Sequence, residues 1–272
     1  MSCIRTDFND NLFFNLIFLM TPSISVILIT KNEILNLAEC LISLSGFADE
    51  IVIVDNQSSD GTLEIAKQFN AKIIQTTSWH GFGPQKNIAL SHASHDWILS
   101  IDADERLTPE LIQEMKSQLI NPQDVICFAI PRLSQYCGKF IHHSGWSPDY
   151  VDRFFKRGQA RFSDHLVHER LLPNGKTKRL SNHLIHYSYR NFEQVINKVN
   201  QYSTLGAEQA FQNGKPSSIF AALYHGFWAF FRTYILRLGF LDGTYGFALA
   251  ISNGQASYYK YIKLLHLNQL RK

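Results

Sequence analysis

Short apolar runs alternate with helical patterns four times between residues 24 and 120. The runs at 24–29, 51–54, 72–75 and 97–101 have the composition of strands, and the first two are fully apolar and rich in β-branched residues. The segments 34–44, 62–69, 84–93 and 108 onward have helical patterns. This alternation with short connections favours an α/β fold, in which a mostly parallel sheet carries helices on both faces.

Polar residues gather directly after three of these strands. They occupy positions 30–33, 55–62 and 102–105. In open α/β sheets, ligands bind beyond the carboxyl ends of the strands. The sequence therefore predicts a ligand site at this edge of the sheet.

Carboxylates dominate that predicted edge. Asp102 and Asp104 are one residue apart, so they can share a divalent cation, or Asp102 can bind a ribose while Asp104 holds the metal. Asp55 ends an apolar strand and needs a polar partner there. It either contacts a ligand or caps the following turn. Because residues 58–60 already supply capping groups, we expect Asp55 to be spare for a ligand.

Three basic residues are candidates for phosphate binding. Lys86 lies in the first turn of a predicted helix, where the helix N-terminus also favours an anion, although a solvated lysine fits the same pattern. Arg153 and Arg157 lie on a predicted strand at 151–156 and just beyond it. They either hold a donor or acceptor phosphate or are solvated at a strand edge.

Charge and cysteine content exclude several classes of protein. The net charge of +3 gives no support for nucleic-acid binding. The four cysteines form no CxxC pair and lack zinc-ligand spacing, which is typical of thiols in a reducing compartment. No Ser-His-Asp or Cys-His arrangement proposes a protein nucleophile.

The N-terminal segment is apolar at 12–20 but too short for a bilayer, which takes about 20 residues. It also lacks the cleavage site of a signal peptide. We expect translation to start at Met20, so that residues 1–19 are absent from the native protein. The alternative is a short arm that contacts a membrane.

The C-terminal region is rich in aromatic residues. An amphipathic helix is expected at 191–212, followed by helices at 217–238 and 246–265. His225, Arg232 and Arg237 interrupt the most apolar stretch, and charge is costly deep in hydrocarbon. The pattern favours amphipathic helices that lie in a membrane interface. Packing on the sheet or a dimer interface would give the same pattern.

The segments 25–33, 50–62 and 96–105, the last with a DXD motif, resemble the inverting glycosyltransferases of family 2. That resemblance implies a Rossmann-like GT-A fold. The segments 81–87 and 162–169 are similar to the branch of lipopolysaccharide core β-1,4-glucosyltransferases. In that branch the donor is typically UDP-glucose and the acceptor an inner-core heptose.

The resemblance also implies roles for single residues. For the donor, it implies that Thr30, Glu33 and Asp55 line the nucleoside pocket and that Lys86 lies near the base or diphosphate. It also implies that Asp102 faces the ribose or a metal ion, Mg²⁺ or Mn²⁺, and that Asp104 binds that metal ion. This chain departs from the family at the catalytic base, where many members carry a Glu-Asp pair and this one has His168-Glu169. By analogy Glu169 is the base and Asp164 the second choice. His168 is either a third metal ligand or a polar loop histidine.

The sequence thus predicts a cytoplasmic glycosyltransferase, peripheral on the inner membrane. It would move glucose from UDP-glucose to a lipopolysaccharide inner-core heptose with inversion. The expected domains are an extension at 1–21, a GT-A domain at 22–190 (nucleotide-sugar half 22–120, acceptor half 121–190) and a helical region at 191–272. The alternatives are a polyprenyl-phosphate glycosyltransferase and a non-catalytic nucleotide-sugar-binding or assembly protein.

Overall fold

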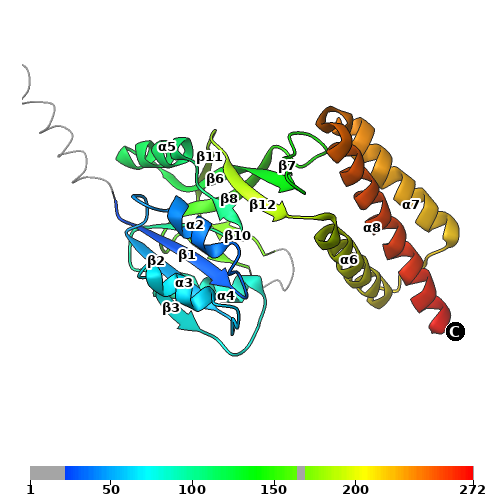
Figure 1. The fold of residues 1–272 in the computed structure, drawn as a ribbon, viewed down its shortest axis with the longest axis horizontal. Helices are drawn as coiled ribbons and strands as arrows, with labels where there is room; N and C mark the ends of the chain where they lie inside the picture. Colours follow the sequence, from blue (N-terminus) through cyan, green and yellow to red (C-terminus); the bar gives the residue numbers. More distant parts are fainter. Residues whose placement is uncertain (1–21, 164–168, 272) are drawn as a thin grey trace, which may run out of the picture. The chain divides into compact units, whose positions relative to one another are not determined.

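The computed structural model of the chain describes residues 22–163 and 169–271 (Figure 1). Contacts divide the chain into two compact units, one of residues 1–131 and 150–184 and one of residues 132–149 and 185–272. The first unit contains the elements β1 (Ile24–Thr30), α2 (Leu37–Ser43), β2 (Glu50–Asp55), α3 (Thr62–Gln68), β3 (Lys72–Gln75), α4 (Phe82–His92), β4 (Trp97–Ser100), β5 (Glu105–Arg106), α5 (Pro109–Ile120), β9 (Ala160–Phe162), β10 (Leu171–Pro173) and β11 (Lys176–Arg179). The strands β6 (Val125–Tyr136), β8 (Asp149–Lys156) and β12 (Leu184–Tyr189) begin in one unit and end in the other.

The sheet of the first unit has the strand order β3-β2-β1-β4-β8-β6. β3, β2, β1 and β4 pair in parallel, and β8 joins β4 in the antiparallel direction. The chain moves outward from β1 to β2 and β3 and then returns to place β4 on the other side of β1. The strand order therefore reverses beside β1, which is where open α/β sheets bind ligands.

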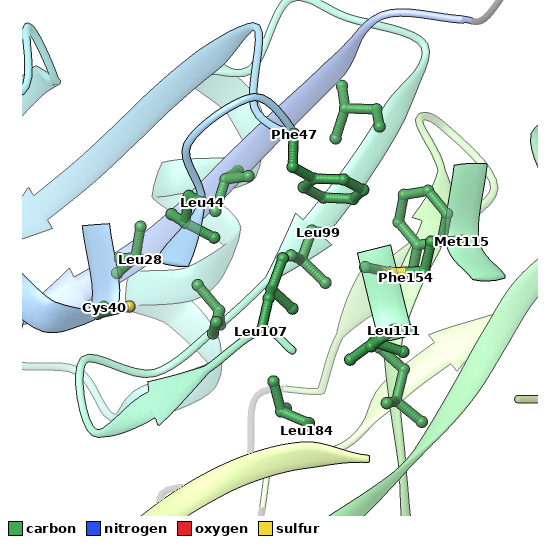
Figure 2. Close-up of a cluster of buried hydrophobic side chains, with 14 of the residues drawn as sticks. Leu28, Cys40, Leu44, Phe47, Leu99, Leu107, Leu111, Met115, Phe154 and Leu184 are labelled. Carbon is green, nitrogen blue, oxygen red and sulfur yellow. The ribbon is translucent and has the colours of Figure 1, made fainter. Parts of the chain in front are cut away.

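Alternating side chains of the strands assign each helix to a face. Val26 and Leu28 of β1 belong to one buried cluster, which α2, α3 and α5 cover. Figure 2 shows part of this cluster, with Cys40 of α2 near Leu28 and Met115 of α5 near Phe154. Ile27 of β1 belongs to a second cluster, which α4 and the β9–β10 hairpin cover. Helices on both faces confirm the expected architecture.

The second unit contains the helices α6 (Phe192–Gln212), α7 (Ile219–Phe231) and α8 (Gly243–Leu270) and the short strand β7 (Lys139–Phe140). α8 packs against both α6 and α7. Tyr136 is fully buried here with Val195 and Leu249, and its hydroxyl lies 2.8 Å from Ser252 Oγ. No helix of the described residues is long and apolar enough to cross a membrane.

The predicted strands and helices are present, with shifted ends. The helix expected from residue 34 begins at Leu37, because Glu33–Asn36 form a turn in which the Glu33 carbonyl accepts hydrogen bonds from Asn36 N and Leu37 N. The helix expected over 217–238 changes after α7 into a π-helical turn, η1 (Arg232–Leu236), and Leu238 then takes a φ of 55°. A 3-10 turn, η2 (Gly239–Asp242), leads into α8.

Two expectations are not settled by this fold. The expected start at Met20 and the alternative membrane arm lie outside the described residues. The domain boundaries at 21, 120 and 190 stay predictions, because a division by contacts does not test whether either part folds alone.

Candidate active site

The candidate active site lies at the carboxyl ends of β1, β2 and β4. Thr30 and Asp55 are paired in register at the ends of β1 and β2, and residues 102–105 follow β4. Parallel strands bring these ends to one edge of the sheet, as the sequence predicted. The edge therefore gathers side chains that lie up to 75 residues apart in the sequence.

Asp55 organises the loop that follows β2. Its carboxylate is fully buried and accepts hydrogen bonds from Thr30 Oγ1 at 2.9 Å, from Ser58 N at 2.9 Å and from the Ser58 hydroxyl. The expectation that Asp55 is spare is wrong, because Ser58 donates to Asp55 instead of serving the next helix. Asp60 serves that helix by accepting from Thr62 N. A contact between Asp55 and a nucleoside stays a prediction.

Asp102 lies between two buried cations. Lys86 Nζ is 3.0 Å from Asp102 Oδ1, and the Arg153 guanidinium binds Asp102 Oδ2. Arg153 also contacts Glu105, which is fully buried and accepts a hydrogen bond from Asp102 N. Lys86 is 2% exposed, so the alternative of a solvated lysine is wrong.

Asp102 and Arg153 stabilise each other's charged forms. Burial raises the pKa of Asp102, but the positive charges of Arg153 and Lys86 outweigh that effect and hold the pKa well below its usual range. Burial likewise opposes the charge of Arg153, but Asp102 and Glu105 raise its pKa above its usual value. Asp102 therefore stays ionised, and neither of its oxygens is free of a cation.

Among the described residues, Arg153 Nε is buried without a hydrogen-bond partner. A buried donor in this position calls for an acceptor atom from a ligand or from water. Arg157, by contrast, is exposed and donates to the His95 carbonyl. Of the two arginines that the sequence left open, Arg153 belongs to the candidate site and Arg157 does not.

Glu169 is brought to Lys86 by a tight contact between α4 and β9. Asn87 forms two hydrogen bonds of 2.9 Å with the backbone N–H and carbonyl of Phe162. Gly83 lies so close to Ser163, the residue after Phe162, that a Cβ atom at Gly83 would be 1.8 Å from the Ser163 carbonyl oxygen. Ser163 N in turn donates to the Arg170 carbonyl at 2.9 Å. Glu169 Oε1 is thereby held 2.9 Å from Lys86 Nζ.

Glu33 is a half-buried carboxylate that interacts with the negative charges of Asp104 and Asp102. Burial raises the pKa of Glu33, and the charges of Asp104 and Asp102 raise it further, although a hydrogen bond from Asn36 lowers it. The described residues contain no group of three His, Cys, Asp or Glu side chains able to hold a metal. Mg²⁺ often binds only one or two protein carboxylates, and phosphate oxygens and water supply its other ligands. Asp104 could be such a carboxylate ligand.

The structure thus joins Thr30 to Asp55, and Lys86 to Asp102 and Glu169. Glu105 was not assigned a role from the sequence, and Arg153 was left open, because the contact of Arg153 with residues after β4 depends on the antiparallel pairing of β8 with β4. The one sequence feature that could have indicated a role for Glu105 is its position three residues after Asp102, which allows its carboxylate to accept a hydrogen bond from Asp102 N. Asp164 and His168 lie outside the described residues, so the second candidate base and the third metal ligand stay predictions.

Comparison with known proteins adds an independent result. The model of glycosyl transferase family 2 matches residues 25–188. An uncharacterized glycosyltransferase of Rickettsia typhi is 32% identical over 256 residues, which cover 90% of this chain and 87% of that protein. The lipopolysaccharide core biosynthesis glycosyltransferase LpsC of Rhizobium meliloti is 30% identical over 231 residues, with 81% and 82% covered.

Among solved structures, S. aureus TarS matches with a TM-score of 0.46 and 17% identity, covering 66% of this chain and 39% of TarS. The family match spans more than half of the chain and includes Thr30, Lys86, Asp102 and Arg153. It also includes Glu169, the carboxylate that contacts Lys86. The chain belongs to glycosyl transferase family 2.

Proposed function

We propose that this chain transfers glucose from UDP-glucose to a heptose of the lipopolysaccharide inner core, with inversion, at the inner face of the cytoplasmic membrane. The observation that carries the proposal is the cluster of Lys86, Asp102 and Glu169 at the carboxyl edge of the sheet. The name of LpsC, a relative at 30% identity, supports an acceptor in the lipopolysaccharide core.

Inverting transfer is a single displacement at the anomeric carbon. The acceptor oxygen forms a bond to that carbon while the bond to the UDP oxygen breaks, and the electron pair leaves with UDP. The acceptor hydroxyl loses its proton to a positioned carboxylate. Such a reaction needs a base and cationic groups on two sides of one carbon, and no protein nucleophile.

The cluster offers both groups at close range. Glu169 is one-fifth exposed, so an acceptor hydroxyl can reach its carboxylate, and we assign it as the base. Lys86 and Arg153 supply positive charge next to it, which stabilises the charge that develops on the leaving diphosphate. Asp102 keeps both cations in place. The loop that Asp55 organises lies at the neighbouring strand end, where we place the nucleoside with Thr30 and Glu33.

We also propose that Mg²⁺ or Mn²⁺ binds at Asp104. The fit rests on the donor set, because Asp104 is a half-buried carboxylate at the strand end and carboxylate oxygens are ligands that these cations prefer. A bound metal would neutralise charge on the diphosphate of the donor. The family resemblance implied Asp102 at the ribose or the metal. His168 is the third ligand that the sequence left open, with a polar loop histidine as the alternative.

Thermal unfolding with a panel of nucleotides tests the donor class. A ligand present at about 100 times its dissociation constant adds about 2.7 kcal/mol to stability, which is visible as a shift in melting temperature. We expect UDP and UDP-glucose to raise the melting temperature, with a larger effect when Mn²⁺ replaces chelator. Stabilisation by another nucleotide alone would contradict the assignment of the donor.

Transfer itself is tested with UDP-glucose and lipopolysaccharide that lacks its core hexoses. The product should gain one glucose with a β-linkage, detected by mass spectrometry and NMR. Transfer to a polyprenyl phosphate instead would favour that alternative. Tight UDP binding without turnover on either acceptor, unchanged in the Glu169→Gln variant, would favour a non-catalytic protein.

A further inference from the structure

The helix α7 presents its largest apolar side chains outward. Phe220, Leu223, Tyr224, Phe227 and Trp228 all have more than 40% of their surface exposed. Their spacing of three and four residues places them on one face of the helix. Phe220 and Phe227 are the most exposed, at 79% and 66%. An apolar stripe of this kind on a free surface marks an interaction site.

The opposite face of α7 is made of small residues. Ala222, Gly226 and Ala229 are buried in the second unit. A Cβ atom at Gly226 would lie 3.3 Å from the Gly254 carbonyl of α8, and one at Gly254 would lie 3.2 Å from the Gly226 carbonyl. The backbones of α7 and α8, which run side by side in Figure 1, therefore approach closely at this point.

The large and small side chains of α7 are placed opposite to those of a helix pair in water. In water, large apolar side chains pack inward, because burial removes them from the solvent. Small residues at a close helix contact, with large apolar residues outside, are typical of helices that face lipid. The packing of α7 on α8 therefore indicates which environment the outer face of α7 meets.

Charge indicates the kind of lipid. Residues 209–271 contain six Lys or Arg and a single acidic residue, Asp242. The Asp242 side chain is 3% exposed and accepts hydrogen bonds from His142 N, His143 N and Ser144 Oγ. Arg232, directly after α7, is exposed. Basic groups beside an apolar face bind anionic membrane surfaces.

The length of α7 limits how it can meet a bilayer. Its 13 residues extend about 20 Å, which is shorter than the hydrocarbon core of about 30 Å. A short helix with one aromatic face and an arginine directly after it fits a position in the plane of the membrane interface.

We propose that the outward face of α7, with Arg232, binds anionic phospholipid and holds the second unit in the interface plane. This inference deepens the proposed function, on which its biological purpose rests, because it names the element and the lipid class that would bring the enzyme to a membrane acceptor.

Flotation of the full chain with vesicles tests the proposal. We expect the protein to float with vesicles of 30% phosphatidylglycerol in phosphatidylcholine, and to float much less with pure phosphatidylcholine. The double variant Phe220→Ser/Phe227→Ser should lower the partition coefficient at least about tenfold. Arg232→Gln should lower it about fivefold on the anionic vesicles alone.

Ile196→Ser is the matched control, because Ile196 is 62% exposed on α6 in the same unit. It should leave flotation unchanged. No flotation of the wild-type chain, or equal flotation with both lipids, would overturn the proposal. So would a dimer in gel filtration that the double variant dissociates without any vesicle binding by the wild type, since the face would then bind a second copy.

UDP-induced stabilisation of the double variant keeps the two proposals apart. We expect this stabilisation to equal that of the wild type, because the variant alters only the second unit. A wild-type chain that binds UDP and performs transfer in detergent but does not bind the vesicles would overturn only the lipid proposal. Vesicle binding without any transfer would overturn only the proposed function.

Discussion

Substitution of Gly83 by alanine tests how the candidate base is positioned. Gly83 is the second residue of α4, and its missing side chain leaves room for the Ser163 carbonyl. A Cβ atom would lie 1.8 Å from that oxygen and 3.0 Å from its carbon. Contacts under 3.0 Å do not occur for real Cβ atoms, so the backbone of α4 or of residue 163 must move by about 1 Å or more.

Two effects of Gly83→Ala oppose each other. Alanine favours the helix by up to about 1 kcal/mol over glycine. Forcing atoms into a packed contact costs about 1–3 kcal/mol, and here the partner is backbone, which yields less than a side chain. We therefore expect a net loss of about 1–2 kcal/mol, or about 2–8 °C in melting temperature for a chain of this size.

The same shift should reach Glu169. Ser163 and Arg170 form hydrogen bonds with each other, so displacement of residue 163 should also move Glu169, which is next to Arg170. A misplacement of about 1 Å can lower a rate by about 10²-fold. We expect transfer to fall on that scale, while UDP binding, measured by thermal shift, changes much less.

Gly206→Ala is the control for this experiment. Gly206 also lies within a helix, but its Cβ would meet Lys260 Cδ at 3.2 Å, which is part of a flexible side chain that can move aside. This variant should be neutral or stabilised, with unchanged transfer. A Gly83→Ala protein with wild-type melting temperature and wild-type transfer would show that the contact between Gly83 and Ser163 does not position Glu169.

Three further predictions concern the charged cluster. Arg153→Met should lower the free energy of unfolding in urea by about 3 kcal/mol, because fully buried Glu105 loses a cation, whereas the exposed Arg157→Met should cost less than about 1 kcal/mol; equal costs would contradict the role of burial. Glu33→Gln should raise the melting temperature at neutral pH. Because the pKa of Glu33 is raised in the folded state, that state binds the Glu33 proton more tightly than the unfolded state does, and the wild type loses stability as the pH rises above about 4.5. The same loss of stability in a pH titration of the variant would show that Glu33 does not cause it. Asp104→Ala should abolish the gain in UDP affinity that Mn²⁺ gives, measured by calorimetry with metal or chelator, and an unchanged gain would remove Asp104 as a ligand.

The ligand-binding edge of the sheet and its polar residues could be predicted from the sequence. Strands that end in polar residues have a strong local pattern, and parallel pairing brings such ends together whatever the details of packing. Thr30, Asp55 and Asp102 were therefore placed correctly at one edge. Lys86 was selected because the sequence predicted a helix from residue 84 with Lys86 in its first turn, whereas α4 begins at Phe82 and Lys86 lies in the second turn. Its burial was not predicted, because burial depends on the segment that packs over the helix.

The remaining contacts depend on tertiary structure. Arg153 reaches Asp102 only because β8 pairs with β4 in a particular antiparallel register, and no local pattern fixes a register between strands about 50 residues apart. Asp60 accepts a hydrogen bond from Thr62 N at the start of the next helix, as predicted, but Ser58 donates to Asp55 instead, and which partner a hydroxyl takes depends on how the loop folds. On α7, the aromatic stripe was visible in the sequence, while the inward face of small residues acquired meaning only from its contact with α8.

Glu169→Gln tests whether Glu169 is the base of a transfer centre built with Lys86. The amide keeps an oxygen that can accept from Lys86 but cannot take a proton from the acceptor. We expect UDP-glucose affinity within about twofold of the wild type and transfer lower by about 10²-fold or more, whereas the exposed Glu39→Gln leaves both unchanged. Near-normal turnover of Glu169→Gln would show that Glu169 is not the base.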